Sequence, residues 1–173
     1  MNRVVWNTRH TDPNQPENTQ PRGPLVAPGT YLVRAEVDGA VSETPLEIRE
    51  DPRIQVDPGV RSQWTADLLA LNALAAAAAN GAQEMRDVAE RVESDRAFRE
   101  ALSSWSEDLG RQWNELSNRA RSLVREVEGW VGPLTADQAS RRSYYEEMVA
   151  TLQREMEAIA RRIGGSRGTE GGT

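Results

Sequence analysis

Residues 61–92 read RSQWTADLLALNALAAAAANGAQEMRDVAERV, with apolar side chains at every third or fourth position. This spacing places side chains on one face of an α-helix. The repeat continues through the whole stretch without a proline, so it predicts one long helix with a continuous packing face. The residues of that face are Trp64, Leu68, Leu71, Ala75, Ala78, Ala82, Met85, Ala89 and Val92.

Two later stretches carry the same spacing and predict two more helices. The three helices are expected at about 59–93, 95–129 and 135–163. Helices joined by short turns run antiparallel, so residues 58–163 are predicted to form an antiparallel three-helix bundle. The additional packing positions are Phe98, Leu102, Trp105, Leu109, Trp113, Leu116, Ala120, Leu123, Val127, Trp130, Tyr145, Met148, Leu152, Met156, Ile159 and Ile163.

The predicted turns carry capping signals. Ser94-Asp95 separates the first two helices and supplies an N-cap. Thr135 and Gln138 have the spacing of a capping box, and Pro133 just precedes them. The last ten residues, GGSRGTEGGT (164–173), have the composition of a flexible tail.

The turn positions also predict a packing register. Folding the chain about Ser94-Asp95 places Trp113 at the level of Ala75 to Ala78, and folding about Gly132 places Leu152 near the same indole. A large side chain against a patch of small ones packs well. The alanine run is therefore interpreted as a groove for an aromatic side chain.

The first 57 residues are rich in proline and β-branched residues, and they contain one clear hairpin. Asp38-Gly39 is a strong two-residue turn signal. The alternation before and after it predicts one buried face, made of Tyr31, Val33, Ala35, Val37, Leu46 and Ile48. Pro45 marks the return strand as an edge or a bulge. An opening strand is expected at residues 3–7, and three strands are too few to close a sandwich.

Composition restricts the classes of function. The net charge of −6 and the interleaved charges argue against nucleic acid as the main partner. There is no cysteine, which excludes disulfides, thiol chemistry and cysteine-based zinc sites. No apolar stretch of this sequence is long enough to span a bilayer, and its start has no signal-peptide pattern. All 21 basic residues are arginine, which is interpreted as codon bias because no basic cluster accompanies it.

No residue is assigned a catalytic, cofactor-binding or metal-binding role. SEDLGRQW (106–113) matches the Asp-box pattern S-x-D-x-G-x-T-W at Ser, Asp, Gly and Trp. Its Leu109 and Trp113 lie on the helical packing face, so the match is interpreted as helix. His10, the single histidine, is interpreted as a solvated loop residue. The acidic groups of the helices are interpreted as a solvated face with arginine partners four residues away, and Glu155 and Glu157 do not share a helix face.

Two segments carry a family resemblance. NRVVWNTR (2–9) and GPLVAPGTYLVRAEVDGAVSETPLEIREDPR (23–53) resemble the C-terminal module of bacterial glycosyl-hydrolase-like proteins with sortilin-type or BNR-type β-propellers. In that family an immunoglobulin-like, hook-capping-like β-domain precedes a helical region. The matching residues are Asn2, Arg3, Trp6, Arg9, Gly23, Pro24, Leu25, Pro28, Gly29, Thr30, Tyr31, Asp38, Gly39, Pro45, Leu46, Asp51, Pro52 and Arg53.

The resemblance implies an α+β chain: a partial, truncated immunoglobulin-like β-sandwich at 1–57, followed by the three-helix bundle. Thr8 and His10 replace the family's usual Leu and Tyr, and the propeller is absent. In the family, further strands precede the segment that residues 2–9 resemble, so this sequence is expected to start inside the β-domain. Residues 1–57 are then expected to unfold more easily than the bundle.

The expected role is a non-catalytic accessory module without cofactor. Its expected partner is a protein, either a β-propeller domain or another chain that covers the open sheet. Two alternatives stay open. The chain is a glycosidase fragment that contributes to a carbohydrate site, or it is a free helical adaptor that self-associates as a coiled coil. The family suggests an exported or cell-envelope parent protein, and the sequence leaves the compartment open.

Overall fold

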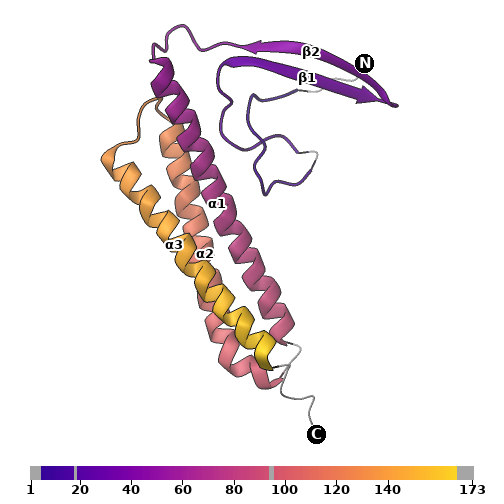
Figure 1. Cartoon of the computed structure of the whole chain (residues 1–173), viewed down its shortest axis with the longest axis vertical. Helices are drawn as coiled ribbons and strands as arrows, with labels where there is room; N and C mark the ends of the chain where they lie inside the picture. Colours follow the sequence, from indigo (N-terminus) through magenta and orange to yellow (C-terminus); the bar gives the residue numbers. More distant parts are fainter. Residues whose placement is uncertain (1–4, 18, 94–95, 167–173) are drawn as a thin grey trace.

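The computed structural model of the 173-residue chain describes residues 5–17, 19–93 and 96–166. These residues form an α+β structure: a two-stranded antiparallel sheet and three helices (Figure 1). The elements follow one another as β1 (Gly29–Val37), β2 (Ala40–Ile48), α1 (Pro58–Glu93), α2 (Arg96–Glu128) and α3 (Ala136–Ser166). The helices form an elongated bundle, and the hairpin projects from the end at which α1 begins.

The core lies between the three helices, on the faces that the spacing predicts. Leu68, Leu71 and Leu123 are fully buried, and the Trp64 indole N–H donates to the carbonyl oxygen of Val127 at 2.8 Å. That hydrogen bond satisfies the polar end of a buried aromatic ring. The side chains of four predicted packing positions lie outside those described: Val92, Phe98, Leu102 and Ile163.

Trp113 packs about one helical turn away from its predicted level. A Cβ atom placed on Gly81 would lie only 2.5 Å from Cδ2 of the Trp113 ring. The Ser117 hydroxyl donates to the carbonyl oxygen of Ala75 at 3.2 Å, which fixes the same register. The small residue that accommodates the indole is therefore Gly81, and the prediction of the Ala75 to Ala78 level is wrong by about one turn.

Two predicted packing positions are exposed. Trp130 is 80% exposed because α2 ends at Glu128, so the helical repeat does not reach it. Trp105 is also exposed, and the neighbouring Ser106 is buried in its place. A residue three or four positions before Leu109 can share its helix face. In the structure this residue is Ser106, three positions before, and not Trp105.

The helix starts follow the capping rules. The Asp57 carboxylate accepts the N–H of Gly59 at 2.8 Å, and Pro58 occupies the first helical position of α1. Before α3, the Thr135 hydroxyl accepts the N–H of Gln138, and the Gln138 side chain accepts the N–H of Thr135. This reciprocal pair confirms the predicted capping box. The predicted Ser94-Asp95 cap lies outside the described residues.

The hairpin forms as predicted. Asp38 and Gly39 have φ angles of 50° and 81°, as a type I′ turn requires, and Val37 pairs with Ala40 on either side of it. Further along the ladder Leu32 pairs with Pro45, so β2 keeps its register through the proline.

Two expectations for the first 57 residues are wrong for the part that the structure describes. Residues 5–7 of the expected opening strand are not in a strand; the Trp6 indole N–H donates to the carbonyl oxygen of Arg9, and Thr8 has a φ of 56°. The hairpin face is not buried either, since Val37 is 68% exposed and only Tyr31 and Ile48 of that face are half-buried. No second sheet among the described residues lies against it.

Candidate interaction site

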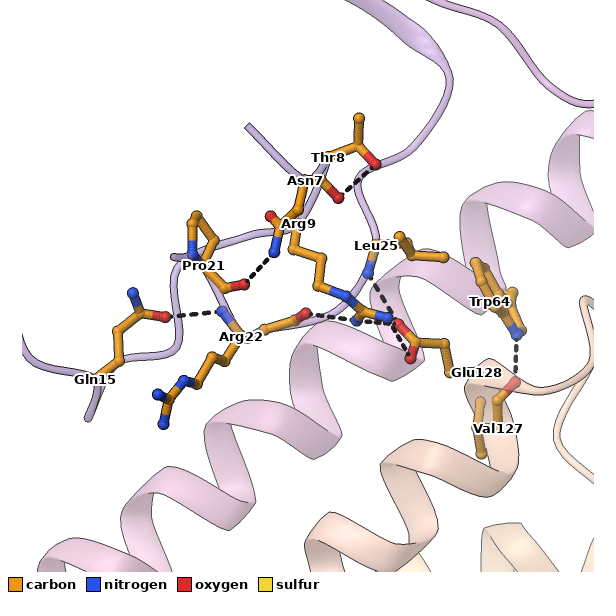
Figure 2. A network of polar contacts seen from close by, with 11 residues as sticks. Asn7, Thr8, Arg9, Gln15, Pro21, Arg22, Leu25, Trp64, Val127 and Glu128 are labelled. Atoms are coloured by element: carbon orange, nitrogen blue, oxygen red, sulfur yellow. Dashed lines mark hydrogen bonds and ion pairs between the residues drawn. The ribbon is translucent and has the colours of Figure 1, made fainter. Parts of the chain in front are cut away.

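An ion pair joins the N-terminal segment to the end of α2 (Figure 2). The Arg9 guanidinium donates to both carboxylate oxygens of Glu128, at 2.8 and 3.1 Å, and to the carbonyl oxygen of Gly23 at 2.9 Å. The same carboxylate accepts the N–H of Leu25 at 3.0 Å. We call this arrangement of Arg9, Gly23, Leu25 and Glu128 the clasp.

The clasp is partly shielded from water, and its geometry is specific. The side chains of Arg9 and Glu128 are 31% and 18% exposed. A two-pronged guanidinium–carboxylate contact is stronger and more directional than a single surface ion pair. Glu128 also accepts the N–H of Leu25, so losing its carboxylate would deprive Arg9 of its charged partner and the Leu25 N–H of its acceptor.

The local backbone explains how Arg9 is presented. Residues 8–10 run antiparallel to residues 23–26, with hydrogen bonds from His10 N to Pro24 O, from Gly23 N to His10 O and from Val26 N to Thr8 O. At Gly23 a Cβ atom would lie 2.6 Å from the His10 carbonyl oxygen, so this close approach requires glycine. The pairing aims the Arg9 side chain at the C-terminal end of α2.

Other contacts attach the same region to α1. The Asn14 amide donates to the carbonyl oxygen of Ala76 at 2.8 Å. Arg61 lies 2.8 Å from the Glu50 carboxylate and stacks over the Trp64 ring at 4.4 Å. The chain on both sides of the hairpin is therefore tied to the bundle.

An aromatic contact continues from the N-terminal segment to the sheet. The rings of Trp6 and Tyr31 meet edge to face, with centroids 5.8 Å apart. The Tyr31 hydroxyl donates to the carbonyl oxygen of Ala27 at 2.7 Å. These contacts hold the start of β1, while the rest of the hairpin extends into solvent (Figure 1).

The hairpin presents apolar side chains on both of its faces. Opposite residues of an antiparallel ladder share a face, so Tyr31 lies beside Leu46 on one face and Leu32 lies beside Pro45 on the other. Five large aliphatic side chains of the two strands are exposed: Leu32, Val33, Val37, Val41 and Leu46. The described part of the chain supplies no third strand to either edge of the sheet.

The sequence-derived candidates for chemistry do not come together in one site. Residues 106–113 are helical within α2, as expected; the exposed Asp108 bonds to Arg111 and Gln112, and Trp113 is buried. His10 is half-buried and contributes backbone hydrogen bonds, so its interpretation as a solvated side chain is only partly correct.

Acidic residues of the helices pair with arginines, some at the predicted spacing of four residues and others between two helices, which the spacing did not predict. Arg142 contacts Asp67 of α1 at 2.7 Å and Glu146 at 2.9 Å. Arg141 contacts Glu126 at 2.6 Å, and this hydrogen-bonded guanidinium lowers the pKa of the Glu126 carboxyl below its ordinary value. Among the residues described, no group of three or more His, Asp or Glu side chains could hold a metal ion.

Sequence reasoning missed the clasp and the arginines around it. A hollow beside the clasp is lined by Arg9 and Arg22 from the N-terminal segment and by Arg121 and Arg125 from α2, together with Asp12 and Glu128. Two of these arginines come from the N-terminal segment and two from α2, so no single stretch of the sequence contains all four. For Arg9 the family resemblance was the available signal, while Glu128 had none.

Comparison of the chain with models of protein families, with curated proteins and with solved structures gave no match. Within the described ranges, no helix combines the length and the apolar character needed to cross a membrane.

Proposed function

We propose that the chain is a non-catalytic interaction module whose hairpin is covered by another polypeptide. The observation that carries this proposal is the exposure of apolar side chains on both faces of β1 and β2, in a hairpin that is tied to a well-packed bundle. An isolated two-stranded hairpin is marginally stable in water. Covering its apolar faces with a partner would supply the burial that it lacks.

The polar groups of the clasp favour a structural role. Arg9 and Glu128 use their charged atoms on each other and on backbone groups. A catalytic acid or base needs an atom that is free to reach a substrate. The clasp instead fixes the position of the segment that leads into β1.

The family resemblance suggests the finer form of this proposal. The sheet would be one part of an immunoglobulin-like sandwich, completed by strands from another polypeptide. The partner would be a sortilin-type or BNR-type β-propeller protein. The chain would then act as an accessory module beside the propeller, and any glycoside chemistry would belong to the propeller.

The test is a binding measurement between this chain and a propeller protein of that type from which the corresponding C-terminal module has been removed. Titration calorimetry is expected to give saturable binding, weakened at least about tenfold by Leu46→Arg. Leu69→Arg is the matched control, because Leu46 in the hairpin and Leu69 in α1 are both 39% exposed. The control is expected to bind like the natural sequence.

Two results would contradict the proposal. One is equal weakening by the two leucine substitutions, because the hairpin would then have no special role. The other is saturable binding of a glycan to this chain alone, in a screen in which the propeller protein does not bind the chain.

A further inference from the structure

The two edges of the hairpin are not equivalent. In a two-residue turn the flanking residues exchange a hydrogen bond, and bonded pairs then alternate along the ladder. The pair Val37 and Ala40 flanks the turn, so Ala35 and Val33 also direct their backbone groups at β2. Leu32, Arg34 and Glu36 therefore direct their N–H and C=O groups outward, along the free edge of β1.

Proline blocks the edge of β2. Pro45 pairs with Leu32, which is a non-hydrogen-bonded position in this alternation. The proline nitrogen therefore faces outward, where it has no hydrogen to donate to an added strand. Proline and short pairing surfaces are common protections of a sheet edge. The edge of β1 carries no proline, so it is the edge that can accept another strand.

The open edge has a self-complementary sequence. Residues 33–37 are Val-Arg-Ala-Glu-Val. When two copies run antiparallel about Ala35, each Arg34 lies opposite the Glu36 of the second copy, and each Val33 lies opposite a Val37. This register also matches the outward-facing backbone groups of Arg34 and Glu36. Registers centred on Arg34 or on Glu36 would place like charges opposite each other.

We propose that the β1 edge pairs with the β1 edge of a second copy of this chain, in the register centred on Ala35. The result is a four-stranded sheet in the order β2-β1-β1-β2, with the valines of both copies on one continuous face. This inference rests on the proposed function, since it identifies a second copy of the chain as one polypeptide that covers part of the hairpin. The two faces of the sheet remain available for another partner.

The intrachain contact of these charges does not oppose the pairing. Within one chain Arg34 and Glu36 lie 3.3 Å apart, and both side chains are largely exposed. An exposed ion pair of this kind is weak and exchanges partners readily. In the paired sheet, each Arg34 instead lies opposite the Glu36 of the second copy, on the neighbouring β1 strand.

The experiment is sedimentation equilibrium of the full chain at low salt, with charge-reversal variants. Arg34→Glu places four acids at the interface and Glu36→Arg places four arginines there, so each variant is expected to weaken self-association about tenfold. An equimolar mixture of the two variants is expected to recover association, because each acid then meets an arginine. The double variant R34E/E36R is expected to associate like the natural sequence.

Glu47→Arg is the matched control, an exposed charge reversal on β2 that is expected to leave association unchanged. Circular dichroism is expected to show the same helix content in every variant, because the substitutions lie outside the bundle. Hydrogen exchange gives a second readout. The amides of Arg34 and Glu36 are expected to gain protection as the protein concentration rises, while those of Val33 and Ala35 are already bonded to β2.

Three results would overturn the inference. The chain could remain monomeric at high concentration, or it could associate with no change in either single variant, which would place the contact on another surface. It could also associate only after residues 1–6 are removed, which would mean that its own N-terminal residues occupy the edge. Binding to the propeller protein with sensitivity to Leu46→Arg would still support the proposed function in each case.

Discussion

The α1–α2 interface and the β1–β2 hairpin both carry apolar residues at a regular period, but they bury them to very different extents. In the helices Leu68, Leu71 and Leu123 have no exposed surface, because three faces meet along one line. In the hairpin Val37 remains 68% exposed. The spacing of apolar residues shows which face of a helix or strand can be buried. Whether that face is buried within the chain depends on how many neighbouring elements pack against it.

The largest expected difference between the two regions is in hydrogen exchange. In dilute solution the amides of residues 68–85 should exchange only through global unfolding, whereas those of Val33 and Ala35 should exchange through local opening of the hairpin. We expect protection factors to differ by more than about a thousandfold. Equal protection would show that the hairpin belongs to the same cooperative unit as the bundle.

A truncation in the core should cost the bundle much of its stability. Trp113→Ala removes an indole that is 1% exposed, and the free energy of unfolding is expected to fall by about 3–5 kcal/mol. Asp108→Ala, five residues earlier and exposed, is expected to change the free energy of unfolding by less than about 0.5 kcal/mol. The opposite order, measured by urea unfolding, would favour the Asp-box interpretation of residues 106–113.

Replacing a glycine inside a helix by alanine usually stabilises the helix, but the contact of Gly81 with Trp113 predicts the opposite effect on stability. Gly81→Ala is expected to destabilise the bundle by about 1–3 kcal/mol, because the new methyl group would meet the indole ring at 2.5 Å. Gly110→Ala in α2 is the control, since its Cβ would lie 3.9 Å from Met85 Cβ, an ordinary van der Waals distance. That variant is expected to gain about 0.5–1 kcal/mol from helix propensity, so equal effects in thermal unfolding would contradict the assigned packing.

Breaking the clasp should loosen the N-terminal segment without unfolding the bundle. Glu128→Gln keeps the shape of the side chain and removes its charge, so the N-terminal segment is expected to lose about 1–3 kcal/mol of local stability. Faster exchange of the Leu25 amide would report this loss. Glu115→Gln, which breaks an exposed pair with Arg119, is the control and should leave that amide unchanged.

The smallest effect concerns pH. Arg141 lowers the pKa of Glu126 in the folded state, so this pair contributes its full stability above the ordinary carboxyl pKa of 4.5. The contribution is lost as the pH falls through the lower folded-state pKa. Because Glu126 is 43% exposed, the loss should stay below about 1 kcal/mol. Glu126→Gln is expected to remove this part of the acid dependence, and an unchanged pH profile would contradict the assignment.

The parts of the fold that depend on local spacing were predictable. The helix starts, the capping box at Thr135 and the turn at Asp38-Gly39 each depend on residues within a few positions of one another. The end of the last helix was predicted three residues too early, because α3 continues to Ser166, into the stretch that its composition assigned to a tail. The level at which Trp113 packs was not predictable, because the position of a turn alone does not set the axial register of two helices. The close approach at Gly81 sets it, and the exposure of Trp130 follows from the end of α2.

The candidate site was the least predictable part. The clasp joins Arg9 and Glu128, and neither has a neighbour in the sequence that marks the pairing. The exposure of the hairpin was also missed, because alternation indicates a face that can be buried and says nothing about what covers it. The sequence alone indicated that Pro45 lies in an edge strand or a bulge. That its nitrogen faces outward could be inferred only from the pairing of Leu32 with Pro45.

The separation of Arg9 and Glu128 along the chain has a consequence for the order of folding. The two residues are 119 positions apart, whereas the hairpin closes over a two-residue turn. Contacts between distant residues form slowly, because the chain entropy must be lost before the contact exists. On a ribosome the segment around Arg9 would emerge on the order of ten seconds before Glu128 is made. The N-terminal segment therefore acquires its anchor late, after α1 and most of α2 have been synthesised.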